Sequence, residues 1–157
     1  MDDIDTKAFL KEREDKLGSK IIWRTYATFF AQLGKEKRNY GVFVYSDGDT
    51  INIEDFERVP AIFGIALSSR RKKDEYVKLE ISFKIDDIES IRLVTRRSAD
   101  LSCSKGQDLA KSPSFLGAFF RKLVTEVKMK DGSIFFFELM SHKEFKTWAK
   151  NINKEIK

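Results

Sequence analysis

Two clusters of basic residues carry the side chains whose chemistry is easiest to name. One follows an apolar run near residue 31, and the other is a run of four basic residues further along the chain. Arginine binds phosphate oxygens bidentately and lysine adds a compact charge, so both clusters suit an anionic ligand. Asp74 and Glu75 partly neutralise the second cluster, which leaves a solvated loop as the alternative. The candidate ligand-binding residues are Lys35, Lys37, Arg38, Arg70, Arg71, Lys72 and Lys73.

A second candidate site lies within residues 92–106. Arg-Leu-Val-Thr-Arg, followed by Asp-Leu-Ser-Cys-Ser-Lys-Gly, resembles the RxxxR and D/NxSxxG motifs of PilZ cyclic-dinucleotide receptors. The glycine stands one residue late, and the two halves are closer together than in PilZ domains. Short motifs of this kind also recur by accident. The resemblance implies a nucleotide site formed by Arg92, Arg96, Asp100 and Ser102.

Aromatic and basic residues are combined in the segment 114–123. Three phenylalanines stand beside two basic residues in what the pattern indicates is a loop. Such a segment suits contact with a membrane interface or with a partner protein. The alternative is that it folds back into the core. The candidate contact residues are Phe115, Phe119, Phe120, Arg121 and Lys122.

Residues suited to catalysis or metal binding are few. His142 is the sole histidine and Cys103 the sole cysteine, so neither an internal disulfide nor a cysteine-based zinc site can form. Four aspartates could offer paired oxygens to a hard cation, although aspartate is also a common turn residue. They are Asp47, Asp49, Asp86 and Asp87. No set of acid, base and nucleophile can be assembled, so we expect no enzyme, no cofactor and no metal.

The composition is that of a folded domain. Hydrophobic residues make up 41% of the 157 residues, and 14 phenylalanines supply bulky core material. The net charge of +5, from 30 basic and 25 acidic residues, permits an anionic partner, but nucleic-acid modules are usually more lopsided. An acidic start and the lack of any apolar run near 20 residues predict a cytoplasmic protein, with peripheral membrane contact as an option.

Hydrophobic periodicity predicts a β-rich domain between two helices. The first helix covers residues 5–17 and ends before Gly18. Alternation is clearest over 77–85, where apolar and polar residues change places at every step, as in a strand with one buried face. The sequence predicts seven strands, over 21–31, 40–45, 50–53, 77–85, 88–95, 123–130 and 133–140. Asp-Gly pairs at 47–48 and 131–132 predict hairpin turns.

A capping box, Ser141 and Glu144, predicts the start of a closing helix over 142–156. At 3.6 residues per turn, four apolar residues of this helix lie on one side. They are Phe145, Trp148, Ile152 and Ile156. We expect this stripe to cover the sheet.

This order of elements resembles the pleckstrin-homology (PH) or GRAM-like superfold, and the segments 83–92, 127–137 and 144–152 carry the resemblance. It implies an α+β, mainly β fold: a seven-stranded antiparallel barrel, or orthogonal sheets, closed by a C-terminal helix. The domain would span 21–157, after an N-terminal helical extension at 1–20. The long connections 57–75 and 97–122 would be insertions.

In PH-like domains the loops after the first, third and sixth strands form the ligand end. The resemblance therefore implies that the two basic clusters converge at one rim, beside Asp131 and Gly132. We expect a binding module that recognises another protein, an anionic lipid headgroup or phosphate. The alternative is a sensor of cyclic dinucleotides or other nucleotides, and fold alone does not decide between them.

Overall fold

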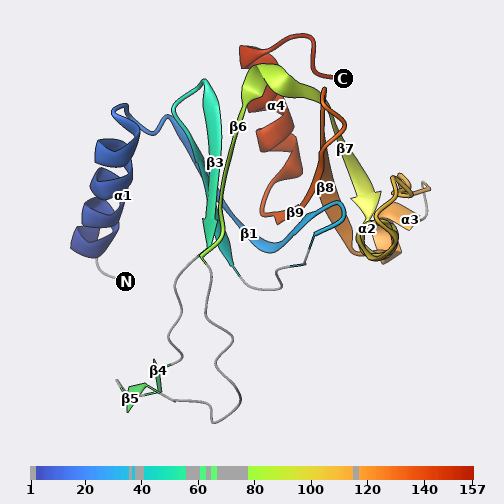
Figure 1. The fold of residues 1–157 in the computed structure, drawn as a ribbon, viewed down its shortest axis with the longest axis horizontal. Coiled ribbons are helices and arrows are strands. Elements are labelled where there is room, and N and C mark those ends of the chain that lie inside the picture. Colours follow the sequence, from blue (N-terminus) through green and yellow to red (C-terminus); the bar gives the residue numbers. More distant parts are fainter. Residues whose placement is uncertain are drawn as a thin grey trace.

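The computed structural model describes residues 3–35, 37, 41–55, 61–62, 65–66, 78–114 and 117–157. These residues form an α+β, mainly β fold, as predicted (Figure 1). The elements, in chain order, are α1 (Asp3–Leu17), β1 (Trp23–Gln32), β2 (Val42–Ser46), β3 (Thr50–Asp55), β4 (Ala61–Ile62), β5 (Ile65–Ala66), β6 (Glu80–Lys84), the 3-10 turn η1 (Ile85–Asp87), β7 (Ile88–Thr95), α2 (Arg96–Lys105), α3 (Gly117–Phe120), β8 (Leu123–Met129), β9 (Ile134–Leu139) and α4 (His142–Ile152).

One antiparallel sheet of seven strands organises the domain, in the order β6-β3-β2-β1-β9-β8-β7. The ten-residue strand β1 is shared by two halves, because Trp23–Ala27 pairs with β2 while Ala27–Gln32 pairs with β9. The register shifts between Ala27 and Phe30, which is the kind of irregularity that bends a strand. The sheet therefore folds along β1, and the two halves face each other across α4 (Figure 1).

A closed barrel was one form of the prediction, and it is wrong. No hydrogen-bonded ladder joins the end strands β6 and β7, both of which the structure describes. The chain passes between them through η1, where Ile85 is buried while Asp86 and Asp87 are exposed. The change of direction at η1 separates the sheet edges β6 and β7. Side chains of the core, and not a ladder of backbone hydrogen bonds, lie between the two halves of the sheet.

The main core lies inside the fold of the sheet, under α4. Phe145 and Ala149 of α4 are buried against strand residues such as Phe30 and Val127. Trp148 stacks on Trp23, with ring centroids 4.6 Å apart. Ser141 caps the helix by accepting from the Glu144 amide, as the sequence predicts.

The predicted end of the closing helix is wrong. α4 stops at Ile152, which is 41% exposed, and Asn153 has extended backbone angles. The Asn153 side chain instead accepts from the Glu155 amide, and this turn brings Ile156 back into the core. Ile156 is thus buried as expected, but from a segment outside the helix.

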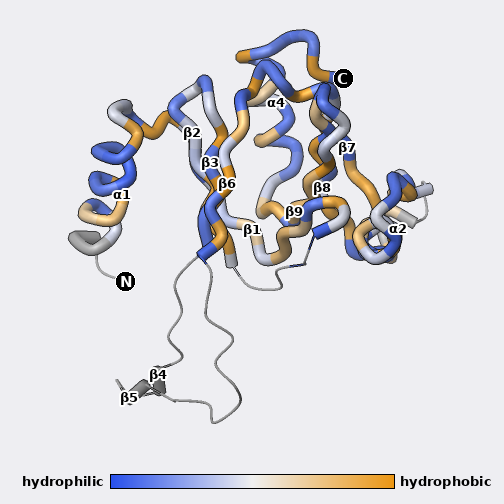
Figure 2. The backbone as a smooth tube through the Cα atoms, in the orientation of Figure 1, coloured by the Kyte–Doolittle hydropathy of each residue, from blue (hydrophilic) through white to orange (hydrophobic). Residues whose placement is uncertain are grey.

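A second core lies on the outer face of β1, β7, β8 and β9. It holds Phe29, Phe136 and Val94 of the sheet together with Ala99 and Cys103 of α2. Figure 2 shows the long hydrophobic stretches in this half of the sheet. The strands here are buried on both faces, and α2 is the element that covers the outer one.

At the opposite end of the molecule, α1 lies on the outer face of β2 and β3 (Figure 1). Phe9 meets Phe43 edge to face with ring centroids 5.2 Å apart, and Arg13 pairs with Glu54. Within the described part of the chain, no helix has the length and hydrophobicity that crossing a membrane requires.

Candidate functional site

α2 is the element around which the candidate site is built. Thr95 caps its first turn by accepting from the Ser98 amide, and Gly106 ends it with φ of 62°, a left-handed conformation that glycine adopts at low cost. Ala99 and Cys103 bury one side of the helix in the second core. The opposite side, with Arg97 and Leu101, therefore faces solvent.

Residues 107–112 run along α2 and are tied to it by serine hydroxyls. The Ser102 hydroxyl accepts from the Leu109 amide at 3.0 Å, and the Ser98 hydroxyl accepts from the Lys111 amide at 3.0 Å. The Thr95 amide donates to the Lys111 carbonyl at 3.0 Å. These bonds make the segment the second wall of a groove whose first wall is the exposed side of α2.

Two adjoining cavities form this groove. The smaller has a volume of 460 Å³ and the larger 740 Å³, and both are lined by Thr95, Arg97, Asp100 and Arg121. Arg96 and Lys122 complete the lining of the smaller cavity. The larger is completed by Ser98, Leu101, Ser104, Leu109, Lys111, Ser112 and Ser114. We refer to the two cavities together as the α2 groove.

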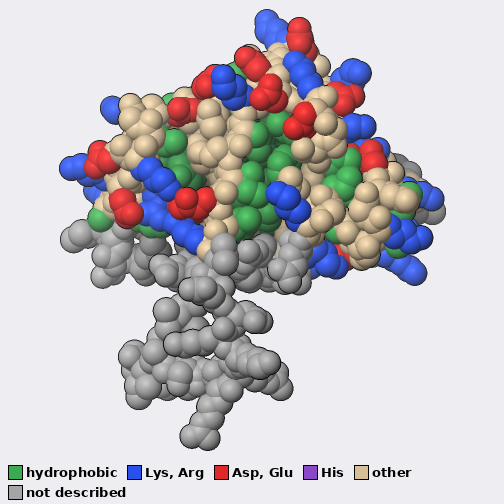
Figure 3. Space-filling model, viewed as in Figure 1, with side chains coloured by type: hydrophobic (Ala, Val, Ile, Leu, Met, Phe, Trp, Pro, Cys, Tyr) green, Lys and Arg blue, Asp and Glu red, His purple; other side chains and the backbone are tan. Residues whose placement is uncertain are grey.

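Positive charge dominates the α2 groove, which holds five cations and one carboxylate. Arg97, Lys111 and Arg121 have no ion-pair partner among the described residues. The one carboxylate, Asp100, pairs with Lys37 at 2.8 Å. In Figure 3, lysine and arginine side chains gather at the right-hand end of the molecule, over α2. The groove thus has cations available for an anion.

Two further cations are held at the rim by a shared carboxylate. Glu138 of β9 pairs with Arg96 at 2.7 Å through one oxygen and with Lys122 at 2.7 Å through the other. Arg96 also lies over the Phe29 ring, 4.5 Å from its centroid. Such contacts fix the positions of the two side chains. Because the guanidinium is a rigid, planar group, they also fix its orientation. Glu138 therefore orders the rim without filling the groove.

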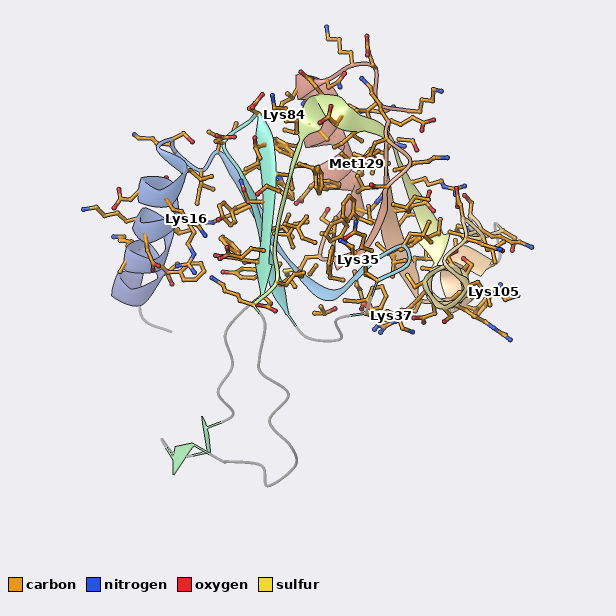
Figure 4. All side chains as sticks on the ribbon, in the orientation of Figure 1. Lys16, Lys35, Lys37, Lys84, Lys105 and Met129 are labelled. Carbon is orange, nitrogen blue, oxygen red and sulfur yellow. The ribbon has the colours of Figure 1, made fainter. Side chains whose placement is uncertain are left out.

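The predicted basic rim is only partly within the described structure. Arg38, Arg70, Arg71, Lys72 and Lys73 lie outside the described residues. Lys35 lies in the turn after β1, where its amide donates to the Gln32 carbonyl. Lys37 lies beside α2 through its pair with Asp100 (Figure 4). The loop after β1 thus contributes one predicted cation to the edge of the α2 groove.

The four residues of the predicted nucleotide site are divided between two environments. Arg96 and Asp100 line the α2 groove. Arg92 instead lies in β7, where the hydrogen bond to the fully buried Glu126 raises the pKa of the guanidinium. Ser102 is fully buried, and its hydroxyl donates to the Ser98 carbonyl. The structure therefore brings two of the four together.

The aromatic and basic segment is described in part. Phe115 lies outside the described residues, and Phe119 belongs to the short helix α3. Phe120 is 87% exposed. The two following residues, Arg121 and Lys122, line the α2 groove. The segment is thus next to the groove, and Phe120 does not fold back into the core.

Other chemistry-bearing residues serve the fold. His142 contacts the Thr125 hydroxyl through Nδ1 at 3.0 Å, and burial lowers the pKa of its ring. Burial raises the pKa of the Cys103 thiol. Asp47 accepts from the Thr50 and Asp49 amides, which lowers the pKa of its carboxyl and makes it a turn residue. Across the part of the chain that the structure describes, no group of three or more potential metal ligands occurs.

The sequence pattern did not predict α2, although its signals are present. Thr95 is a good capping residue and Gly106 a good terminator. The buried face consists of small residues, Ala99, Ser102 and Cys103, so no apolar stripe marks the helix. The unbroken apolar run Ile134–Phe137 was a second signal for this helix. Such a run indicates a strand that is buried on both faces, so another element must pack on each face of the sheet.

Comparisons with known proteins gave no match: no protein-family model fits this chain, and no curated protein sequence matches it.

Proposed function

We propose that this chain is a non-catalytic binding module that takes a phosphate-bearing anion in the α2 groove. The observation that carries the proposal is the set of cations Arg97, Lys111 and Arg121, which line one groove without a carboxylate partner among the described residues. Elsewhere, cations such as Arg13 and Arg92 are taken up by buried glutamates. Charges left unpaired in a concave site are the ones that a ligand can use.

The groove offers three kinds of donor that suit phosphate. Arginines can bind phosphate oxygens bidentately, and lysine adds a compact charge. Serine residues line both walls of the groove, Ser104 from α2 and Ser112 from the segment 107–112. Arg97 also stands in the first turn of α2, where the helix dipole favours negative charge. Leu101 and Leu109 add apolar surface to the two walls, which suits a ligand with an apolar part beside its phosphate.

The PH-like assignment is part of the same proposal. It is supported by the strand order, in which β1 lies at the centre of the sheet, and by the helix α4 that packs between the halves. The groove differs from the rim that the resemblance implies, because α2 is inserted between β7 and β8. Lys37, a residue of the predicted rim, lies beside the α2 groove through its ion pair with Asp100. A phosphate or a lipid headgroup is therefore the expected ligand class, bound mainly by the insertion.

Titration calorimetry with inorganic pyrophosphate and inositol hexakisphosphate tests the proposal. The variant Arg97→Glu/Arg121→Glu should lose about 100-fold in affinity, since each charge-assisted hydrogen bond contributes about 1.5–3 kcal/mol. The matched control is Lys11→Glu/Lys20→Glu, which changes the net charge equally at exposed positions on the far side. Equal affinity in the two variants would mean that binding reflects net charge alone, and the α2 groove would not be the site.

A nucleotide is the second candidate ligand, because Arg96 and Asp100 of the predicted motif line this groove. A thermal-shift screen with cyclic dinucleotides tests it. A ligand at 100 times its Kd adds about 2.7 kcal/mol to the free energy of unfolding, which gives a clear shift in Tm. If pyrophosphate binds and no cyclic dinucleotide shifts Tm, the nucleotide candidate is excluded and the phosphate site stands.

A further inference from the structure

Phe120 is the most exposed large hydrophobic side chain among the described residues, at 87%. It ends the short helix α3 and directly precedes Arg121 and Lys122, which line the α2 groove. Leu101, on the exposed side of α2, is 45% exposed and lines the same groove as Arg121. Apolar side chains are thus exposed next to the cations proposed to bind phosphate.

Cations lie at the same end of the molecule as these apolar side chains. Arg97 and Lys111 line the groove, and Lys105 is exposed in the last turn of α2 (Figure 4). Glu138, which could neutralise this end, is already shared between Arg96 and Lys122. The charge of this face is therefore complementary to a surface of negative charge.

We propose that this face binds an anionic lipid bilayer, with Phe120 inserted into the interface and lipid phosphates in the α2 groove. The inference rests on the proposed function of the groove and names the source of its phosphate. Amphipathic surfaces of this kind, an aromatic side chain flanked by lysine and arginine, bind membranes through apolar burial combined with attraction to anionic lipids.

A protein partner fits this surface less well. The centres of protein interfaces are depleted in charged residues, and lysine in particular is rare there. Here Arg121 and Lys122 follow Phe120 directly, and Lys111 lies in the adjoining groove. A bilayer tolerates this arrangement, because the aromatic ring enters the apolar boundary while the cations stay at the level of the headgroups.

Vesicle sedimentation tests the inference. The wild-type chain should bind vesicles of phosphatidylcholine with 30% phosphatidylserine, and not vesicles of phosphatidylcholine alone. Phe120→Ala should weaken binding to the anionic vesicles about 10-fold, equivalent to about 1.4 kcal/mol. The matched control is Ile22→Ala, which removes a side chain that is 62% exposed before β1, in the half of the molecule away from α2.

The same variants separate the two proposals. Phe120→Ala should keep the affinity of the wild type for pyrophosphate, because Phe120 does not line the groove. If the wild type binds pyrophosphate but ignores anionic vesicles, the membrane inference is overturned and the groove stands. If Phe120→Ala binds the vesicles as tightly as the wild type, insertion is overturned. If neither pyrophosphate nor vesicles bind, both proposals fail.

Fluorescence gives a second readout of insertion. In Phe120→Trp, the new indole should shift its emission to shorter wavelength when anionic vesicles are added, and nitroxide-labelled lipids should quench it. The wild-type chain supplies the background, since Trp23 and Trp148 are stacked on each other at 4.6 Å. An emission change no larger than that of the wild type would overturn the insertion of residue 120.

Discussion

The two ends of this molecule both carry cations, but the cations at one end are paired with carboxylates more completely than those at the other. At the α1 end, Arg13 and Lys78 share Glu54, whose side chain is 5% exposed, and Lys16 and Lys78 pair with Glu80. At the α2 end, the cations of the groove outnumber the carboxylates. Pairing therefore decides which charges a ligand can reach, since a paired cation must first leave its carboxylate.

The two helices also cover the sheet in different ways. α2 buries Ala99 and Cys103 against an apolar face, and its polar side is left for solvent. The contacts of α1 with the sheet include Phe9 on Phe43 and the ion pairs Arg13–Glu54 and Lys16–Glu80. The ion pairs of α1 therefore help to hold that helix on the sheet, whereas α2 is held mainly by its buried side, and its Arg97 pairs with no carboxylate among the described residues.

Replacing a paired arginine should have the largest effect on stability. Arg92→Met leaves Glu126, which is fully buried, without its ion partner, and the free energy of unfolding should fall by about 3 kcal/mol. Arg97→Met, its control on α2, should change stability by less than about 0.5 kcal/mol. Urea denaturation measures both. A loss as large for Arg97 as for Arg92 would contradict the contrast between paired and unpaired cations.

Arg13→Met should cost less, about 1.5 kcal/mol, because Lys78 remains as a partner of Glu54 at 3.2 Å. The variant also loses the contact of Arg13 with the Phe9 ring, 3.6 Å from the guanidinium carbon to the centroid. Amide hydrogen exchange should become faster in α1 and stay unchanged in α2. Lys11→Met, an exposed position on the same helix, is the control, and equal exchange in the two variants would exclude a role of the pair in docking α1.

Asp100→Asn should strengthen the binding of pyrophosphate about 5-fold. The substitution removes the one carboxylate that lines the α2 groove and releases Lys37 from its ion pair. Because that pair is exposed, its loss should change the free energy of unfolding by less than about 1 kcal/mol. Calorimetry gives the affinity and urea denaturation the stability. Weaker binding in this variant would mean that Asp100 helps to hold the ligand.

The smallest effect is expected from pH. Burial, and secondarily Lys146, lower the pKa of His142 from its ordinary value of 6.5, so the unfolded chain takes up this proton more readily than the folded one. Stability from this group is complete above about pH 6.5 and falls as the pH drops below that value. In His142→Gln, the urea midpoint should change less between pH 7.5 and pH 5.5 than it does in the wild type. An unchanged slope would mean that His142 titrates alike in both states.

Much of the fold could be predicted because its signals are local. Alternation over residues 77–85 marks β6, and the Asp-Gly pairs form the turns between β2 and β3 and between β8 and β9. The sequence did not predict α2 because the buried face of this helix is made of small residues. The helix is stabilised by covering strands whose outer face is also apolar. The α2 groove exists only because α2 forms. Some of its residues could therefore be named from the sequence, but the sequence did not show that they line one groove.

The kinds of element and the available chemistry can be read from the sequence, because turn residues, caps and hydrophobic periods act within a few positions of the chain. The sequence also shows that arginine and lysine are plentiful, with 30 of them in 157 residues. Which of these cations have a carboxylate partner depends on the three-dimensional fold. Arg92 meets Glu126, 34 positions away, whereas Arg97 meets no carboxylate among the described residues. Ion pairing depends on distances of a few ångströms, and those distances are set by the folding of the sheet along β1.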